Sequence, residues 1–273
     1  MQIVTFPGMG LELKLNKIAI TIGNISIHWY AILIVLAIAM ALFLLYIRRK
    51  KSEIKFEDIV DLMLYLIPIS IISARIYYCL FSGDYYFKNT LEILNIRNGG
   101  LAIYGGIIGG ATTCWVFCKK RKINLLQLLD MLAPYLALGQ AIGRWGNFIN
   151  VEAYGVETKL PWRMGIIEKG IYKEVHPTFL YESIANFAIF LVLTYINSGK
   201  SKQKYKFAGK TTYIYFILYS FARFFIEGIR IDSLMLKSIR ISQILSLAIF
   251  VVFGILLAKK ILEHRKMSRN LEK

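Results

Sequence analysis

Residues 27–51 read IHWYAILIVLAIAMALFLLYIRRKK, and this stretch decides the class of the fold. Up to Ile47 it contains no Asp, Glu, Lys or Arg, and about 20 apolar residues are enough to cross the hydrocarbon core of a bilayer as a helix. A run of basic residues follows it directly, while no basic region precedes it. The stretch therefore predicts a retained membrane helix whose C-terminal end is cytoplasmic, and not a cleaved signal peptide.

Six further apolar blocks of similar length follow, and the chain is 56% apolar, above the roughly 45–50% of soluble domains. The sequence therefore predicts an all-α integral membrane protein with seven transmembrane helices, a short N-terminal hairpin and a small outer cap. The seven blocks are 27–47, 59–81, 101–118, 123–142, 177–196, 211–229 and 241–258. We expect one polytopic domain divided into a surface hairpin (1–26), spans one to four (27–142), an outer cap loop (143–176), spans five to seven (177–258) and a cytoplasmic basic tail (259–273).

The net charge of +17 is distributed in alternate loops. Most of the Lys and Arg residues follow the first, third, fifth and seventh blocks, at 48–55, 119–122, 200–210 and 259–273. Basic loops stay in the cytoplasm, so the N-terminus is predicted outside the membrane and the C-terminus on the cytoplasmic side. A nucleic-acid-binding surface would not alternate with hydrophobic blocks, which argues against that class of partner.

Two minor features complete the organisation. Residues 1–26 alternate apolar and polar side chains around the turn signal Gly23-Asn24, which predicts a hairpin lying on the outer membrane surface. The three cysteines lie within or at the edges of the apolar blocks and have no metal-ligand spacing. We predict no metal site, no cofactor and no disulfide, and interpret these cysteines as small buried residues.

Polar and aromatic side chains gather at the predicted outer ends of the spans. They are His28-Trp29-Tyr30, Arg75, the run Gly99-Gly100-Leu101-Ala102-Ile103-Tyr104-Gly105-Gly106, the run Gly143-Arg144-Trp145-Gly146-Asn147-Phe148-Ile149-Asn150 with Glu152, Tyr154 and Gly155, then His176-Pro177 with Leu180-Tyr181-Glu182, and Tyr219, Arg223, Glu227 and Arg230. Each group also has a structural interpretation: a snorkelling arginine at a glycine-rich helix end, an aromatic belt, tight glycine packing, or an ion pair between helices. Together, however, arginines concentrated at one leaflet favour an anionic lipid head group.

In these same motifs and their order the chain resembles bacterial prolipoprotein diacylglyceryl transferases over nearly its whole length. The resemblance implies transfer of a diacylglyceryl group from phosphatidylglycerol to the lipobox cysteine in a prolipoprotein signal peptide, with release of glycerol phosphate. It also implies a seven-span fold that lipid enters sideways from the membrane. The nucleophile then belongs to the substrate, so none of the cysteines of this chain needs to react.

The resemblance also implies roles for individual residues. Arg144 is the expected phosphatidylglycerol ligand, Arg223 lies near the reacting centre, and Asn147 orients the head group. Glu152 and Glu227 are expected to hold the arginines. The other expected substrate contacts are Tyr30, Tyr219, Gly155, Glu182 and Arg230. Arginine suits a phosphate leaving group because its planar fork remains charged in a low dielectric.

Tyr104 departs from the family pattern, which often has a histidine there that has been proposed as the general base. A tyrosine with an ordinary pKa of about 10 is a poor base at neutral pH. Either an arginine activates Tyr104, or its hydroxyl only binds substrate and the proton goes to a carboxylate or to the departing phosphate. We favour the positioning role.

Two other classes fit a polytopic chain. A secondary transporter is expected to have inverted repeats and charges near the midplane, whereas the charges here are displaced outward and no repeat is evident. A membrane scaffold would not need arginines gathered at one outer cavity. A transfer assay with phosphatidylglycerol and a lipobox peptide separates these classes from a transferase.

Overall fold

The computed structural model describes residues 2–51, 53–83, 85–96, 99–198, 207–233, 235–236 and 239–271 of the chain. They form two compact units, the first made of Met1–Phe43 and Leu129–Lys273 and the second of Leu44–Leu128. Residues 199–206, which hold most of the predicted basic loop at 200–210, and the last two residues of the predicted cytoplasmic tail lie outside the described residues. The prediction of a single domain stays a prediction.

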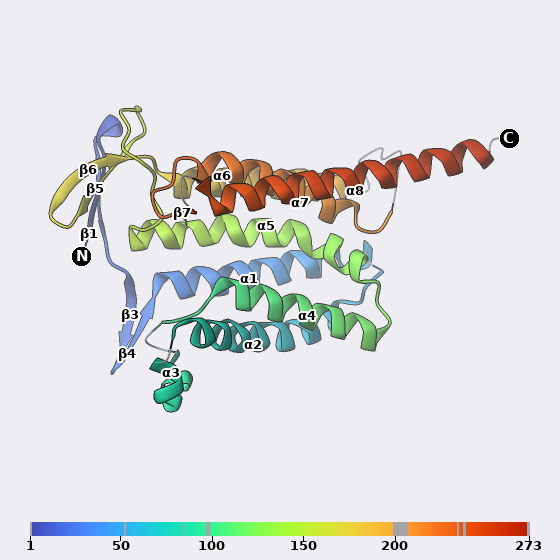
Figure 1. The fold of residues 1–273 in the computed structure, drawn as a ribbon, viewed down its shortest axis with the longest axis horizontal. Helices are drawn as coiled ribbons and strands as arrows, with labels where there is room; N and C mark the ends of the chain where they lie inside the picture. The colour runs from blue at the N-terminus through green and yellow to red at the C-terminus, as the bar shows by residue number, and fades with distance from the viewer. Residues whose placement is uncertain are drawn as a thin grey trace. The chain divides into compact units, whose positions relative to one another are not determined.

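The described part of the chain is mostly helical, with one long helix in each apolar block (Figure 1). These helices are α1 (Trp29–Arg48), α2 (Phe56–Phe81), α4 (Ile103–Arg121), α5 (Leu125–Asn150), α6 (Thr178–Ile196), α7 (Lys210–Glu227) and α8 (Ile241–Leu271). Five of them, α1, α2, α5, α6 and α8, are long and apolar enough to cross a membrane. The chain is therefore a multi-pass membrane protein. Glycines and threonines dilute the apolar content of α4, and charged residues interrupt α7, so the count of seven spans stays a prediction.

The end of α5 corrects the predicted boundary between the fourth span and the outer loop. We predicted that the span ends at residue 142, where the continuous apolar stretch stops, but the helix continues to Asn150. Gly146 lies in this extension, and a Cβ at that position would be 2.3 Å from the ring of Tyr30 in α1. Close packing of α1 on α5 thus uses a glycine that weakens a helix in isolation. Arg144 and Asn147 consequently lie on a helix and not in a loop.

The strands form three small antiparallel sheets. The strands are β1 (Gln2–Phe6), β2 (Leu11–Leu15), β3 (Ile18–Ile22), β4 (Ile25–His28), β5 (Met164–Glu168), β6 (Ile171–Val175), β7 (Met235–Leu236) and β8 (Ile239–Arg240). The β3–β4 hairpin turns at Gly23-Asn24 as predicted, with Ile22 paired to Ile25. The rest of the N-terminal segment differs from the prediction, because β1 joins β2, β5 and β6 in one sheet of order β2-β1-β5-β6.

This four-stranded sheet lies where α5 ends and α6 begins (Figure 1). One apolar cluster joins the three elements, and its buried members are Val4, Phe6, Phe148, Met164, Ile166, Val175 and Phe179. The rings of Phe148 and Phe179 stack with centroids 4.4 Å apart. The apolar face of the sheet therefore fixes the end of α5 against the start of α6, which are the two elements that carry Arg144 and Glu182.

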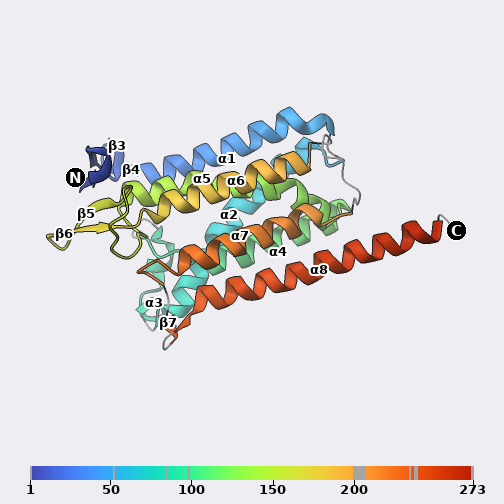
Figure 2. The same cartoon turned by 90° about the horizontal axis from the view of Figure 1, so that it is seen from above.

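Further along the first unit, α7 lies between α6 and α8 (Figure 2). Asp130 of α5 accepts hydrogen bonds from the backbone N–H groups of Gly209 and Thr212, both at 2.7 Å. It also accepts one from the Thr212 hydroxyl. The first N–H groups of a helix have no partner within the helix, so a carboxylate from a neighbouring helix satisfies the start of α7 and complements its dipole.

In the second unit, α2 packs along α4. The contact face is made by Gly105 and Gly109, where an added Cβ would be 2.4 Å from the Ser73 carbonyl oxygen and 2.3 Å from the Ser73 hydroxyl oxygen. Gly106, on the neighbouring face, has its nearest such contact at 3.7 Å. Gly105 and Gly109 are thus one turn apart on the face where the two helices come closest.

Arg75 of α2 organises the segment that leads into α4. Its guanidinium donates hydrogen bonds of 2.6–3.0 Å to backbone carbonyl oxygens, namely those of Glu92, Ile93, Asn95, Gly99 and Gly100. Five carbonyl acceptors around one buried cation hold the chain through the short η3 helix (Thr90–Leu94) and the Gly99-Gly100 turn. Arg75 is therefore a structural clamp just before Tyr104.

Candidate active site

The site is built on the last two turns of α5. Arg144 and Asn147 are three residues apart and share one face of the helix, and Arg144 Nη1 donates to Asn147 Oδ1 at 3.2 Å. The neighbouring Trp145 donates from its indole to Ser183 Oγ of α6 at 3.1 Å, and Ser183 donates in turn to the Ala141 carbonyl oxygen at 2.9 Å. These bonds tie α5 to α6 next to the arginine.

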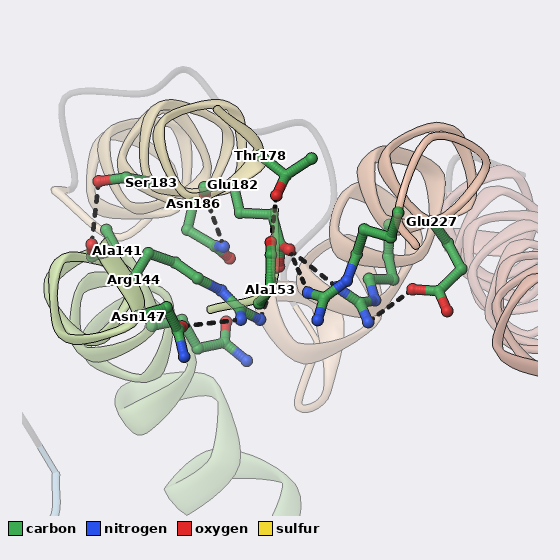
Figure 3. A network of polar contacts seen from close by, with 12 residues as sticks. Ala141, Arg144, Asn147, Ala153, Thr178, Glu182, Ser183, Asn186 and Glu227 are labelled. Carbon is green, nitrogen blue, oxygen red and sulfur yellow. Dashed lines mark hydrogen bonds and ion pairs between the residues drawn. The ribbon is translucent and has the colours of Figure 1, made fainter. Parts of the chain in front are cut away.

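Glu182 of α6 is the centre of the site (Figure 3). Its side chain is 3% exposed, and three arginines contact its two oxygens. Arg144 Nη2 lies 2.6 Å from Oε2, while Arg223 Nη1 and Arg230 Nη1 lie 2.9 and 2.8 Å from Oε1. A carboxylate offers about four lone-pair directions, so one buried acid can orient three guanidinium groups that come from α5, from α7 and from the segment after α7.

The three arginines differ in how completely carboxylates neutralise them. Arg230 forms a fork with Asp232, from Nε to Oδ1 at 2.9 Å and from Nη2 to Oδ2 at 2.6 Å. Arg223 forms an ion pair with Glu227 one turn along α7 at 2.6 Å. Among the described residues, the carboxylate partner of Arg144 is Glu182 alone, and its side-chain hydrogen bond goes to the neutral Asn147 amide.

The exposed fractions of the three arginine side chains follow the same order as their neutralisation. The side chains of Arg144 and Arg223 are 22% and 19% exposed, and that of Arg230 is 9% exposed. Burial disfavours the Arg230 charge, but its hydrogen bonds and charge contacts with Asp232 and Glu182 outweigh this effect and raise its pKa. Asp232 is partly buried too, and Arg230 holds the pKa of that carboxyl below its ordinary range. Arg230 is thus a fixed support, while Arg144 and Arg223 have cationic surface to offer an anion.

Glu152 supports the site in a different way from the one predicted. We expected it to hold an arginine, but its Oε1 accepts hydrogen bonds from Asn147 Nδ2 at 2.8 Å and from Asn150 Nδ2 at 3.2 Å. Because the Asn147 amide donates to Glu152, its oxygen is left to accept from Arg144. Glu152 therefore reaches Arg144 through Asn147. Glu227 does contact an arginine directly, as expected for it.

The turn after α5 is held in an unusual backbone conformation. Val151 has φ of 51° and Ala153 has φ of 57°, and the left-handed region is unfavourable for side chains with a Cβ, above all for a β-branched valine. The turn is fixed by a hydrogen bond from Glu152 N to the Asn147 carbonyl oxygen at 3.0 Å and by another from the Thr178 hydroxyl to the Ala153 carbonyl oxygen. The strained turn places Glu152 beneath Asn147.

Gly155 acts through its backbone. Its N–H donates to the His176 carbonyl oxygen at 3.0 Å, and it forms an isolated antiparallel bridge with Arg230. A Cβ on Gly155 would be 2.8 Å from that of His176 and 3.0 Å from the Ile229 carbonyl oxygen. The glycine lets the segment after α5 lie directly against the segment that carries Arg230. Its role as a substrate contact stays a prediction.

The tyrosines predicted to line the site fall in different places. Tyr219 of α7 lines a small pocket between α6 and α7 together with Glu182 and Arg223. Tyr30 packs its ring on Gly146, next to Arg144 on the same helix. Tyr104 belongs to the second unit, where its ring centroid lies 6.4 Å from that of Tyr77. Within the described residues, no group of three or more His, Cys, Asp or Glu side chains is arranged to hold a metal ion.

Sequence reasoning named Glu182 as a substrate contact but missed that it binds three arginines at once. It also missed Asp232, two residues after Arg230, and Asn186, one turn after Glu182 on the same face of α6. The spacing of Glu182 and Asn186 was a usable signal, since residues four apart share a helix face. The convergence on Glu182 had no local signal, because Arg223 and Arg230 are 41 and 48 residues away along the chain.

Known proteins resemble this chain over most of its length. A model of the family described as prolipoprotein diacylglyceryl transferase matches residues 17–259. A protein of Finegoldia magna named phosphatidylglycerol–prolipoprotein diacylglyceryl transferase is 47% identical over 246 residues, which cover 90% of this chain and 96% of the relative. Proteins of the same name from Listeria monocytogenes and Clostridioides difficile are each 44% identical. These matches cover 93% of this chain and 93% of the Listeria protein, and 89% of this chain and 94% of the Clostridioides protein.

Proposed function

Because the chain belongs to the prolipoprotein diacylglyceryl transferase family, we propose that it transfers the diacylglyceryl group of phosphatidylglycerol to the thiol of the lipobox cysteine of a prolipoprotein. The product is a thioether-linked lipid on the exported protein, and glycerol phosphate leaves. This is the first step of bacterial lipoprotein maturation. The observation that carries the proposal is the convergence of Arg144, Arg223 and Arg230 on the buried Glu182.

The phosphate of the lipid binds Arg144 and Arg223. The support is their residual exposure and their incomplete neutralisation, since Glu182 is shared among three guanidinium groups. A bidentate guanidinium matches the geometry of a phosphodiester better than an ammonium does. Glu182, Arg230 and Asp232 hold the two arginines at fixed positions before lipid arrives, so little reorganisation is needed when charge moves onto the phosphate.

In the reaction, the cysteine sulfur forms a bond to the carbon of the diacylated glycerol that is linked to the phosphate. The bond between that carbon and the phosphate oxygen breaks. The bonding electron pair leaves with glycerol phosphate, and the proton lost by the thiol balances the added negative charge. A thiol with a pKa of about 8.5 is mostly protonated near neutral pH. The arginines therefore assist the step by stabilising the leaving group.

The remaining predicted residues have supporting roles. Asn147 orients the head group and is held by Glu152, and Tyr30 and Tyr219 line the lipid site. Tyr104 positions substrate through its hydroxyl and does not act as a general base, since a phenol hydroxyl is a poor base at neutral pH. Gly155 keeps the segment that carries Arg230 close to the end of α5.

We also propose that α4 and α7 cross the membrane together with the five more apolar helices. Both pack along helices that are themselves long and apolar enough to span, α4 along α2, and α7 along α6 and α8. With the N-terminus outside and the basic loops inside, Arg144 and Glu182 lie near the outer face of a bacterial cell membrane. Lipid reaches them sideways, and the signal peptide presents its cysteine from the outer side.

The test is a transfer assay with the purified protein in detergent, phosphatidylglycerol and a synthetic lipobox peptide. Mass spectrometry is expected to show the gain of one diacylglyceryl unit on the peptide. A peptide with serine in place of the lipobox cysteine is the matched control and should gain nothing. Absence of any gain on the cysteine peptide, with a protein shown to be folded, would refute the proposal.

A further inference from the structure

Asn186 of α6 carries a buried acceptor that the proposed mechanism does not use. The residue is 3% exposed, and its Nδ2 donates to the Glu182 backbone carbonyl oxygen at 2.8 Å. A carbonyl oxygen only accepts, so the amide nitrogen must face it and the orientation of the side chain is determined. The amide oxygen, Oδ1, then has no hydrogen-bond partner among the described residues.

This oxygen belongs to the site, since Asn186 lines the pocket between α6 and α7 with Glu182, Tyr219 and Arg223. Figure 3 shows the Asn186 side chain beside Glu182, pointing from α6 toward the arginine network. The small residues Ala185 and Ala222 line the same pocket. A buried acceptor without a donor is costly in a folded protein, so its presence in a pocket indicates a ligand that donates.

The occupant of the pocket must combine two chemical features. Arg223 supplies a cationic group that suits a phosphate oxygen, and Asn186 Oδ1 needs a hydroxyl or N–H donor. A glycerol phosphate head group has both, because its glycerol carries free hydroxyls a few bonds from the phosphate. Resting on the proposed function, we infer that Asn186 Oδ1 accepts a hydrogen bond from a hydroxyl of the phosphatidylglycerol head group and so selects for that head group.

The inference gives Asn186 a role in lipid specificity. A site built to hydrogen-bond a substrate hydroxyl rejects an analogue that lacks it, because the buried polar group is then left unpaired. The matching lipid is phosphatidylpropanol, which has the same phosphodiester and acyl chains but no head-group hydroxyl. The wild-type protein is expected to use it with kcat/KM lower than for phosphatidylglycerol by about tenfold or more.

The experiment measures kcat/KM for both lipids in the wild type and in Asn186→Leu, which keeps the size of the side chain and removes its acceptor. We expect Asn186→Leu to lose about tenfold on phosphatidylglycerol and to treat the two lipids within about twofold of each other. A structural role alone would slow both lipids equally and keep their ratio. Retention of the wild-type ratio in the variant, or a wild type that does not discriminate, would overturn the inference.

Thr194→Val is the matched control. Thr194 lies two turns further along α6, and its buried hydroxyl oxygen also has no hydrogen-bond partner in the part of the chain that the structure describes, but Thr194 does not line the pocket. Its variant should keep the wild-type ratio. If Asn186→Leu does not fold, Asn186→Ala removes the same acceptor with a smaller side chain. A folded wild type that is inactive with both lipids would instead refute the proposed function, and this inference with it.

Discussion

At the scale of single residues, the site depends on how one buried acid is shared. Glu182 is almost completely enclosed, and its contacts are the guanidinium groups of three arginines. Two buried charges attract strongly but lose their hydration, so a buried ion pair is worth little by itself while an unpaired buried charge is expensive. Removal of the Glu182 charge would therefore be costly, because it would leave three arginine cations facing one another.

Replacing Glu182 tests this view. Glu182→Gln keeps the shape of the side chain and removes its charge, and breaking a buried ion pair by removing one partner costs about 3–5 kcal/mol. We expect the melting temperature of the purified protein to fall clearly and transfer to be lost at temperatures where the variant is still folded. An unchanged melting temperature would show that the three arginines do not depend on Glu182. Glu263→Gln, at an exposed ion pair with Lys260, is the control and should leave the melting temperature unchanged.

His176 gives a prediction about pH. Burial lowers its pKa below the ordinary value of 6.5, so the unfolded chain binds a proton at this position more readily than the folded one. The sign follows from linkage: this contribution to stability is fully present above pH 6.5 and is lost as the pH falls below it. The melting temperature should therefore drop less between pH 8 and pH 5 in His176→Gln than in the wild type. An equal drop in melting temperature for the wild type and His176→Gln would contradict the lowered pKa of His176.

At the scale of elements, the sequence predicted helices at all seven places, because hydrophobic periods and lengths are local properties. It missed what depends on distant partners. The pairing of β1 with β5 joins Val4 to Ile166, and the sequence near Gln2–Phe6 does not predict this pairing. The end of α5 was placed too early because the contact of Gly146 with Tyr30 is a tertiary one. Local propensity was outweighed there by packing between helices.

The site shows the same division between local and distant information. The motif residues Arg144, Asn147 and Glu182 could be named from the sequence, because they fall in motifs that resemble those of a known family. The contacts of Glu182 with three arginines could not be named, since they are made between different elements. The link of Glu152 to the asparagines, and the support of Arg230 by Asp232, depend on the turn after α5 and on the segment after α7.

The contact between α2 and α4 gives an element-scale prediction. At Gly105 an added methyl group would meet the Ser73 backbone, whereas at the adjacent Gly106 it would have ordinary space. Overpacking of a tight contact typically costs about 1–3 kcal/mol. Gly105→Ala should therefore lower the melting temperature, and Gly106→Ala should leave it nearly unchanged. Equal effects of the two variants would show that Gly105 is not at the helix contact.

At the scale of the whole molecule, the distribution of charge fixes the expected orientation. Basic residues follow alternate apolar blocks, so the segment after α5 is predicted outside and the end of α4 inside. Lys159 and Lys120 are exposed residues in these two places. In a chain whose native cysteines are replaced by alanine, Lys159→Cys should react with a membrane-impermeant thiol reagent in intact cells. Lys120→Cys should react only after permeabilisation, and the reverse pattern would contradict the orientation.

The orientation also explains how charge and function belong together in one chain. In the proposed orientation the cytoplasmic side carries the excess of Lys and Arg, while the arginines of the site are matched by Glu182, Glu227 and Asp232. The arginines of the site therefore do not belong to the excess of basic residues that predicts the orientation. They form a preorganised cluster, and in the proposed function its least neutralised member, Arg144, exchanges part of its contacts for a phosphate.

The central claim is that the guanidinium fork of Arg144 holds the phosphate of the donor lipid during transfer. The direct measurement is the rate of diacylglyceryl transfer to a lipobox peptide by the wild type, Arg144→Lys and Arg144→Ala, each shown to be folded by its melting curve. Loss of a charged hydrogen-bond partner costs about 1.5–3 kcal/mol, which is roughly a tenfold to a hundredfold loss in rate. Arg144→Ala should therefore lose on the order of a hundredfold, and Arg144→Lys should lose at least about tenfold. Near-normal transfer by Arg144→Lys would contradict the claim.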